Sequence, residues 1–491
     1  MNADDRRGVS LPQLSKDHDE SRLEILTTKE KLSSAFTIAC SECRPLTGSY
    51  QTRADFYVLT EHYVTPYNSH WSTQLSNSLT VGTILGQIII GYLCDVKGRK
   101  WGIVLSTVMI VIGIILCTAS HGANGSFIGF LWMFTVCRGI TGIGLGGEYP
   151  SCSTSAAEAA NEKIRKQRGP VFIMVTNFVL SFGTPFACIL YLIVFEAAGG
   201  LQANLSTVWR TVFGISCIPP LAVFYFRFKM LNSQLYRKGA IQHNVPHLLT
   251  IKYYWKFLDR YCGGVVFVRL HYLPQRFSGQ IISSVVLVKG KELVRKTAEY
   301  QLLLGTIALP GCVVGALLVN HLGRRNTMIL GFSGYLIFGL AVGCAYDKVI
   351  KNVPGFIVLY GLMNSFANAG PGDMLGLTSS ESYATAVRGT CYGFSAAIGK
   401  VGAVLGTQAF KPIQDNLGKR WTFIIAAICG LAGMTVTWFF IRNDLDGDLA
   451  IEDAKFQVFL EANGWHGDVG AAESVDALVV SEKGKAKVST G

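Results

Sequence analysis

Charged side chains inside apolar stretches are the residues of this sequence best placed to do chemistry. Arg138, Glu148 and Glu158 lie in or just after an apolar run that begins at Phe127. Ionisable groups at membrane depth are expensive to insert and are usually functional. For Arg138 two interpretations stay open: a functional charge at membrane depth, or a buried Arg–Glu pair that only locks helices together. A buried carboxylate can take up and release protons, which makes Glu148 a candidate titrating group.

The same stretch is rich in glycine. Gly139, Gly142, Gly146 and Gly147 recur at roughly helical spacing, and small residues let two helices approach closely in lipid. Gly142, Gly144 and Gly147 also fit the pattern GxGxxG, but a dinucleotide site needs a preceding strand in a βαβ unit. Because a long apolar segment precedes these glycines instead, nucleotide binding is excluded.

Two further charged residues interrupt apolar runs later in the chain. Lys400 is the only charge in the run 391–410, and glycines flank it. The central position of Lys400 disfavours snorkelling to the membrane surface, and a buried cation of this kind can bind an anion. Asp373 follows Gly370-Pro371-Gly372. Backbone groups freed by such breaks can line a cavity, although a simple helix cap is the alternative.

Composition points to a membrane protein. The chain has 491 residues, of which 50% are hydrophobic and 15% charged, against roughly 25% charged in soluble domains. The net charge of +12 does not indicate nucleic acid, because Lys and Arg cluster in short loops between apolar runs. The 13 Cys are scattered and imply no disulfide framework. No metal-ligand cluster or nucleophile–base pair stands out, so we expect no enzyme, cofactor or metal site.

Apolar segments of about 20 residues, long enough to cross a bilayer, recur along the chain and predict an all-α integral membrane protein. Two poorer segments, near 34–64 and 262–289, would complete twelve transmembrane helices, although both contain several charged residues. We number the expected spans 1 to 12 on that basis. The other ten lie near 75–94, 101–120, 126–147, 170–196, 207–227, 297–319, 326–345, 353–378, 391–410 and 420–441.

The expected organisation is two six-helix halves with polar tails. The predicted parts are a disordered cytoplasmic N-tail (1–33), a first half (34–228), a cytoplasmic central loop (229–261), a second half (262–442) and a cytoplasmic C-tail (443–491). Basic residues gather in alternate loops, as the positive-inside rule requires of cytoplasmic loops. The sequons at Asn124 and Asn204 fall in opposite loops, so both termini are expected inside.

An internal repeat supports the two halves. GYLCDVKGRK (91–100) and ALLVNHLGRR (316–325) share a small residue, then Asp or Asn, then Gly-Arg-Lys/Arg. The glycine permits a tight turn between spans, and the acid can pair with basic groups at helix ends. The predicted conformational motif consists of Gly91, Asp95, Gly98, Arg99, Lys100, Asn320, Gly323, Arg324 and Arg325.

These residues carry a family resemblance. The paired loops resemble the signature of the major facilitator superfamily, with twelve helices in two six-helix halves. RGITGIGLGGEYPSCSTSAAE (138–158) and NAGPGDMLGLTSSESYATAVRGT (368–390) resemble its phosphate:proton symporter family, within it the glycerophosphoinositol and glycerophosphocholine permeases. GFSAAIGKVGAVLG (393–406) and STQLSNSLTVGTILGQ (72–87) resemble the same branch, and the resemblance covers nearly the whole chain, roughly 69–465.

The resemblance implies a proton-coupled carrier of a phosphate-bearing organic anion such as glycerophosphoinositol. Its implied setting is the plasma membrane, as a monomer whose partners are the substrate anion, protons and lipid. By resemblance Lys400 faces the phosphate, Tyr149 offers it a hydroxyl, and Asn177 stands where phosphate relatives carry a Gln amide. With Asp373 these are the predicted substrate-binding residues, and Glu148 and Arg138 are those of proton coupling.

The resemblance fails at spans 1 and 7, which line the central cavity in this fold. The family's span 7 carries a motif of the form WFLYDF...FPNG, whose Asp serves the substrate and proton site. This chain reads RYCGGVVFVRLHYLPQR at 260–276, yet a one-nucleotide frame shift is compatible with GTAGAWFLYDFITFPNG there. A two-base shift over 44–50 similarly allows Ala-Ser-Asp-Gly-Phe. We expect 260–276 and about 41–58 to be out of frame, through a gene-model or sequencing error or compensating shifts, leaving both spans degraded.

The sequence therefore leaves alternatives to a glycerophosphodiester carrier. One is a carrier of inorganic phosphate or another solute of the superfamily. Another is a receptor-like or inactive homologue, because spans 1 and 7 are disrupted.

Overall fold

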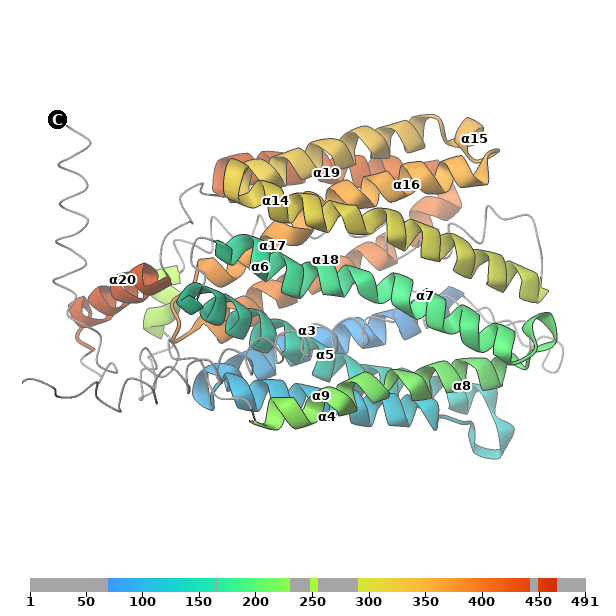
Figure 1. Ribbon diagram of the computed structural model, residues 1–491, viewed down its shortest axis with the longest axis horizontal. Helices are drawn as coiled ribbons and strands as arrows, with labels where there is room; N and C mark the ends of the chain where they lie inside the picture. Colours follow the sequence, from blue (N-terminus) through green and yellow to red (C-terminus); the bar gives the residue numbers. More distant parts are fainter. Residues whose placement is uncertain (1–68, 164–166, 230–247, 255–289, 442–448, 466–491) are drawn as a thin grey trace, which may run out of the picture.

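The computed structural model describes residues 69–163, 167–229, 248–254, 290–441 and 449–465. Across these ranges the chain forms helices joined by short turns and contains no strand. Most of the helices run along the long axis of the molecule (Figure 1). Predicted spans 1 and 7, the N-tail, most of the central loop and both frame-compatible segments lie outside the described residues.

Helices form at all five remaining spans predicted for the first half. Spans 2 to 4 are single helices, whereas spans 5 and 6 each consist of consecutive pieces. They are α3 (Ser69–Val96), α4 (Arg99–Thr118), α5 (Phe127–Lys163), then α6 (Arg168–Ile173), the π-helical η3 (Met174–Phe178) and α7 (Val179–Ala197), then α8 (Leu205–Ser216) and α9 (Ile218–Lys229). Short 3₁₀ turns, η1 (Ala123–Gly125) and η4 (Gly200–Gln202), join neighbouring spans.

The second half repeats this order. α14 (Gly290–Cys344) holds spans 8 and 9, because Gly323, with φ of 76°, breaks it into two helices. Gly98 has φ of 101° between α3 and α4, so both glycines of the repeat make the turn that the sequence predicts. The remaining elements are α15 (Tyr346–Val349), α16 (Val353–Ala367), the π-helical η5 (Asn368–Gly372), α17 (Asp373–Glu381), α18 (Arg388–Leu417), α19 (Arg420–Phe440) and α20 (Leu449–Ala462).

Two ends of the bundle are distinguished by their turns. We call the end with the Gly98 and Gly323 turns the motif end, and the end with the Asn124 and Asn204 sequons the sequon end. α20 lies beyond the motif end, at the left of Figure 1, beside the described segment 248–254. This helix lies within the C-tail, for which no helix was expected.

Glycines bring α3 and α5 into direct backbone contact. A Cβ at Gly86 would lie 1.9 Å from the Ile143 carbonyl oxygen, and one at Gly146 would lie 2.1 Å from that of Thr83. No side chain larger than hydrogen fits at such distances. The predicted glycine face of α5 is therefore confirmed as a helix-packing surface.

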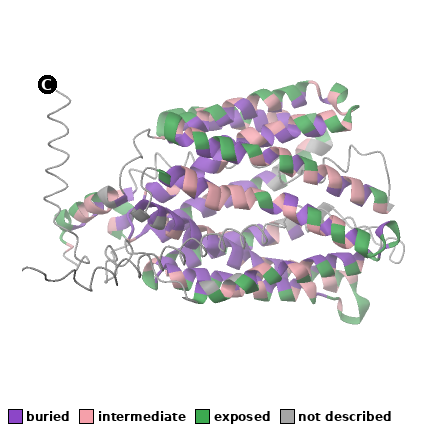
Figure 2. Ribbon diagram, in the orientation of Figure 1, coloured by how far each residue is buried: buried purple, intermediate pink, exposed green. Residues whose placement is uncertain are grey.

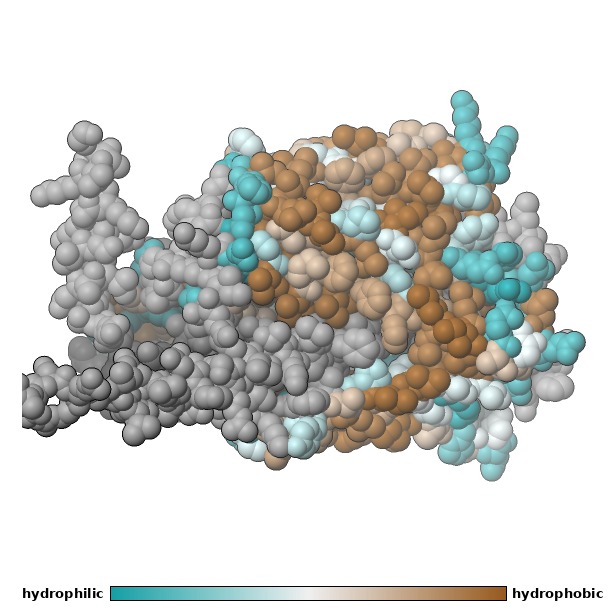
Figure 3. Space-filling model, in the orientation of Figure 1, coloured by the Kyte–Doolittle hydropathy of each residue, from teal (hydrophilic) through white to brown (hydrophobic). Residues whose placement is uncertain are grey.

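The outer surface is apolar. Six of the described helices are long and apolar enough to cross a membrane, and large side chains such as Ile193, Ile337 and Phe439 are exposed. Buried residues follow the interior faces of the helices (Figure 2), and apolar atoms cover much of the visible surface between its more polar ends (Figure 3). Exposed apolar surface of this extent fits contact with lipid, so the chain is a multi-pass membrane protein.

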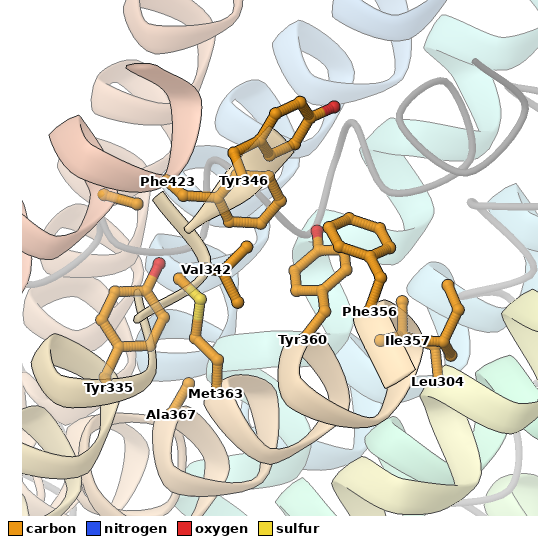
Figure 4. Packing of buried hydrophobic residues seen from close by; sticks show 11 residues of the cluster. Leu304, Tyr335, Val342, Tyr346, Phe356, Ile357, Tyr360, Met363, Ala367 and Phe423 are labelled. Atoms are coloured by element: carbon orange, nitrogen blue, oxygen red, sulfur yellow. The ribbon is translucent and has the colours of Figure 1, made fainter. Parts of the chain in front are cut away.

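Aromatic packing holds the second half together toward the sequon end. Rings from α14, α15, α16 and α19 meet in one buried cluster (Figure 4). The ring centroids of Tyr360 and Phe423 lie 5.3 Å apart at 87°, an edge-to-face arrangement that aromatic pairs prefer. Tyr346 and Phe356 meet edge to face in the same cluster, 6.2 Å apart.

Candidate functional site

Glu148 is fully buried in the first half and forms an ion pair with Arg227 of α9. The Arg227 guanidinium also donates to the Thr107 hydroxyl of α4, so this contact joins spans 3, 4 and 6. The cation that neutralises Glu148 thus comes from its own half of the molecule.

Arg138 lies elsewhere on α5. The ~15 Å of helix between Arg138 and Glu148, at a rise of 1.5 Å per residue, prevents these two residues from pairing with each other. The Arg138 guanidinium is buried and lies 5.7 Å from the centroid of the Phe134 ring. An Arg138–Glu148 lock is therefore not what holds α5 in place.

Two of the predicted substrate-binding residues meet between the halves. The Lys400 ammonium of α18 lies 5.0 Å from the centroid of the Tyr149 ring of α5. Lys400 is only 8% exposed, so its charge is held away from the membrane surface. A cation at this distance interacts favourably with the face of an aromatic ring.

The other two predicted substrate-binding residues also meet between the halves. The Asn177 amide donates to Asp373 Oδ1 at 2.5 Å, which joins span 5 to span 10. Asn177 lies within η3, and η5 ends directly before Asp373. Each residue thus lies in or beside a π-helical turn, a feature frequent at functional sites.

The repeated motif builds a cluster of buried charges at the motif end. We call Asp95, Arg99, Glu158 and Arg388 the first cluster. Arg99 donates to Asp95 at 2.5 Å and to Glu158 at 2.9 Å, and Arg388 of α18 donates to Glu158 at 3.1 Å. Arg99, Glu158 and Arg388 are fully buried. Because α18 belongs to the second half, this cluster joins the two halves.

Asp95 also contacts the start of α18 directly. Its carboxylate accepts the backbone N–H groups of Gly389 (2.9 Å) and Thr390 (2.6 Å), and the Thr390 hydroxyl. Helix N-termini favour negative charge because their first N–H groups have no partner within the helix. A Cβ at Gly91 would lie 2.7 Å from the Gly389 carbonyl oxygen, so the glycine permits this approach.

The second copy of the motif builds an equivalent cluster. We call Arg324, Glu381 and Arg168 the second cluster, together with Asn320, which takes the place of Asp95 in the repeat. Glu381 is buried and accepts from Arg324 at 3.0 Å and from Arg168 at 2.8 Å. Arg168 begins α6 as Arg388 begins α18, so the second cluster also joins the halves. The basic residues that end each motif turn outward: Lys100 lies over the Phe228 ring and Arg325 over the Trp438 ring.

The C-terminal helix covers the first cluster. Asp453 of α20 accepts from the Thr385 backbone N–H at 2.5 Å and from its hydroxyl at 2.7 Å. The Tyr254 hydroxyl accepts the Ala384 N–H at 2.8 Å. Both contacts hold the turn between α17 and α18, directly before Arg388. Burial raises the pKa of Asp453 above its ordinary value, and Arg388 and Thr385 oppose that rise.

Sequence reasoning missed several of these groups. Arg227, near the end of span 6, resembles the basic residues of a following loop. Arg168 and Arg388 look like ordinary helix-end charges, and only the matched Arg-Gly pairs at 168–169 and 388–389 hint at a common role. Gln87 of α3 is fully buried, and both of its side-chain polar atoms lack a hydrogen-bond partner among the described residues. A single Gln in an apolar run gave no signal.

The arrangement can hold a polar anion and change conformation. A buried cation and a phenol lie between the halves, and a carboxyl–amide pair joins them at a second place. Ion pairs close both inter-half contacts at the motif end. Such a site suits binding and alternating exposure of a charged solute.

Known proteins resemble this chain over most of its length. A family model described as "Sugar (and other) transporter" matches residues 46–242 and 275–443. Glycerophosphoinositol permease 1 of Candida albicans is 50% identical over 461 residues, covering 92% of this chain and 87% of that protein. Glycerophosphoinositol transporter 1 of Saccharomyces cerevisiae is 48% identical over 415 residues, covering 84% and 79%.

Solved structures share the fold. The major facilitator superfamily proton:xylose symporter XylE, bound to 6-bromo-6-deoxy-D-glucose, superposes with a TM-score of 0.72 at 18% identity. The alignment covers 89% of this chain and 99% of that one. The fold predicted from the paired loops is thereby confirmed.

Proposed function

Since the chain belongs to the sugar (and other) transporter family of the major facilitator superfamily, we propose that it carries a glycerophosphodiester such as glycerophosphoinositol across the plasma membrane with protons. The two relatives named above are a glycerophosphoinositol permease and a glycerophosphoinositol transporter. Their high identity over most of both chains supports the same substrate class here.

The observation that carries this proposal is the Lys400–Tyr149 contact. A charged residue at the centre of a membrane helix costs on the order of 2.5–3.5 kcal/mol to insert, so a buried lysine needs a reason to be there. A phosphodiester has one negative charge and oxygens that accept hydrogen bonds. Lys400 would bind that charge, and the Tyr149 hydroxyl would donate to a phosphate oxygen.

The motif end is proposed to face the cytoplasm. Support comes from the positions of the basic loops and of the sequons, which lie at opposite ends. Protease protection or glycan mapping that places Asn204 inside the cell would overturn this orientation. With the motif end closed by both clusters, the structure fits a carrier sealed toward the cytoplasm.

Uptake of labelled glycerophosphoinositol tests the substrate proposal. The chain would be expressed in cells that lack their own uptake system, alongside K400A, K400R and Y149F. We expect K400A to abolish uptake at unchanged surface expression, and K400R to retain part of it because the charge remains. Unchanged phosphodiester affinity in K400A would overturn the assignment of Lys400. Stronger competition by inorganic phosphate than by glycerophosphodiesters would favour the phosphate carrier.

A second candidate is an inactive homologue. The family model leaves residues 243–274 unmatched, which includes most of the segment 260–276 that is compatible with a frame shift. The coding DNA over this segment is the direct test. Uptake would also be compared between the chain as written and one carrying GTAGAWFLYDFITFPNG at 260–276, at matched surface expression. Equal uptake by both chains would contradict a functional defect.

A further inference from the structure

We propose that Asp373, and not Glu148, carries the proton that this transporter couples to its substrate, with Asn177 as its positioning residue. The inference rests on the proposed function and deepens it. It concerns the carboxyl–amide pair that joins span 5 of the first half to span 10 of the second.

Glu148 is poorly suited to the task because its charge is already compensated. Arg227 and Glu148 are both fully buried and form an ion pair within the first half. A proton arriving at Glu148 would leave Arg227 as an uncompensated buried cation, which is strongly unfavourable in a low-dielectric interior. This pair is better suited to holding spans 4 and 6 together.

Asp373 differs from Glu148 in its partners. It is 1% exposed, and Oδ1 accepts from the Asn177 amide at 2.5 Å, whereas Oδ2 has no hydrogen-bond donor in the part of the chain that the structure describes. The groups of the described residues that act on its carboxyl are the Asn177 amide and the thiol of Cys312. Cys312 in turn donates to the Ser181 hydroxyl at 3.5 Å. With no cation beside it among the described residues, the buried group is more stable as the neutral acid than as the carboxylate.

The backbone of α14 accommodates the protonated oxygen. A Cβ at Gly315 would lie 2.0 Å from Asp373 Oδ2, so only glycine leaves room for this oxygen. The acid is thus enclosed by α14 on one side and by span 5 on the other. We infer that water reaches it when the contact between the halves opens.

Two π-helical turns make this contact suited to opening. Asn177 lies in η3, and Asp373 follows η5 directly. A π turn leaves local backbone hydrogen bonds out of register, and such turns are frequently functional. When the halves rock apart, the Asn177–Asp373 bond breaks and the carboxyl meets water.

The proton step balances without a further reactant. A proton from water on one side of the membrane forms the O–H bond on Asp373 Oδ2. The same bond breaks when the site opens on the other side, and the proton passes to water there. The carboxyl can therefore alternate between neutral and charged forms once per cycle, while the substrate anion binds at Lys400.

Infrared spectroscopy tests this inference independently of transport. Purified full-length protein in lipid bilayers would be compared with D373N and E148Q at neutral pH. We expect the C=O stretch of a protonated carboxylic acid in the wild type and in E148Q, and its loss in D373N. E148Q should instead lose carboxylate intensity. Loss of the acid band in E148Q, or its persistence in D373N, would overturn the inference.

Isotope labelling tests the inference without any variant that has to fold. Carbon-13 in the aspartate carboxyls should shift the acid band, whereas carbon-13 glutamate should not. A band that shifts only with labelled glutamate would overturn the inference. Because no substrate is used, this result does not depend on whether the wild type transports glycerophosphodiesters.

Transport assays then separate a proton carrier from a structural residue. D373N keeps the shape and the acceptor for Asn177 but cannot carry a proton. We expect it to lose uptake driven by a pH gradient to a much greater extent than exchange of labelled for unlabelled glycerophosphoinositol. D373E keeps the acid and should retain pH-driven uptake better than D373N. Better rescue by Asn than by Glu would contradict the inference and indicate a structural role. If the wild type shows neither uptake nor exchange, the proposed function fails, and the infrared result still decides the protonation of Asp373.

Discussion

The first and second clusters occupy equivalent places in the two halves but differ in charge. Both pair two arginines around a buried glutamate, Glu158 in one and Glu381 in the other. The first cluster has Asp95 at the position where the second has Asn320. The equivalent positions thus balance two arginines with two carboxylates on one side and with a single carboxylate on the other.

The helix starts that the two clusters contact differ in the number of backbone N–H groups they can donate. Asp95 accepts two backbone N–H groups at the start of α18, from Gly389 and Thr390. At the start of α6 the residues in these places are Gly169 and Pro170, and proline has no N–H to donate. An acid at position 320 would therefore gain less than Asp95 does. The two contacts between the halves have the same arrangement of residues, but the contact made by Asp95 is expected to be the stronger one.

The largest loss of stability is expected when the buried glutamates of the two clusters, Glu381 and Glu158, are replaced. E381Q removes the single carboxylate of the second cluster and leaves Arg168 and Arg324 buried without their shared counter-charge. Breaking a buried ion pair costs about 3–5 kcal/mol. E158Q should cost less, because Asp95 still faces Arg99. Thermal unfolding in lipid, with accessibility of a cysteine introduced at the motif end, measures both variants. A larger loss in E158Q would contradict the charge comparison.

The next largest effect is expected at the equivalent positions 95 and 320, where the first cluster has Asp and the second has Asn. D95N weakens the contact with the start of α18, and hydrogen bonds to charged groups contribute about 1.5–3 kcal/mol. The motif end should open more often, which thiol labelling of an introduced cysteine detects. N320D is the matched control, and the missing N–H of Pro170 should keep its gain below the loss in D95N. Equal and opposite effects would show that the two helix starts are equivalent.

The close helix contacts at glycines are expected to be equally important for stability in the two halves. A Cβ at Gly86 or at Gly311 would lie 1.9 Å from a carbonyl oxygen, that of Ile143 or Ser365. G86A and G311A should therefore destabilise the protein by similar amounts, about 1–3 kcal/mol for overpacking. Thermal stability of the two variants, with G214A as a control at a site with open space, tests this. A clear inequality would break the symmetry of the packing.

The smallest effect is expected from α20, which among the described residues covers only the first cluster. Burial places the pKa of Asp453 above its ordinary 3.8, so the docked helix binds a proton more readily than the released helix. Docking of α20 is therefore strongest in acid and weakens as the pH rises from near 3.8 through the raised pKa. Hydrogen exchange of α20 should quicken over that window in the wild type. D453N should abolish the pH dependence, and a docking strength that rises with pH would contradict the sign.

Much of the fold followed from the sequence. The ten clear spans, the glycine face of α5 and the two Gly turns were predicted from apolar length, spacing and the internal repeat. The structure has helices at all ten places and confirms the glycine face and the turns. Two pairs of predicted site residues, Lys400 with Tyr149 and Asn177 with Asp373, lie in contact. The roles of these residues stay predictions.

The sequence could not predict which residues that are far apart in the chain contact each other. The ion pair of Glu148 depends on which face of α9 turns inward, and periodicity in a helix that is apolar on every face before Arg227 does not reveal that. The choice between Glu148 and Asp373 depends on whether a cation lies nearby, which is a property of tertiary packing. The docking of α20 depends on a few residues in a tail that otherwise reads as polar.

The long separation between partners in the clusters has a consequence for biosynthesis. Glu158 meets Arg99, which lies 59 residues earlier and is already made when α5 leaves the ribosome. Arg168 pairs with Glu381, which is translated 213 residues later. At about 5–20 residues per second, translation leaves Arg168 without this partner for about 10–40 s. During that interval Arg168 can still donate to Asn161 of the first half, but its charge has no carboxylate from Glu381 and meets water, lipid headgroups or the insertion machinery instead. Mutations in the second cluster should therefore lower yield by degradation of the nascent chain, before any defect in transport is seen.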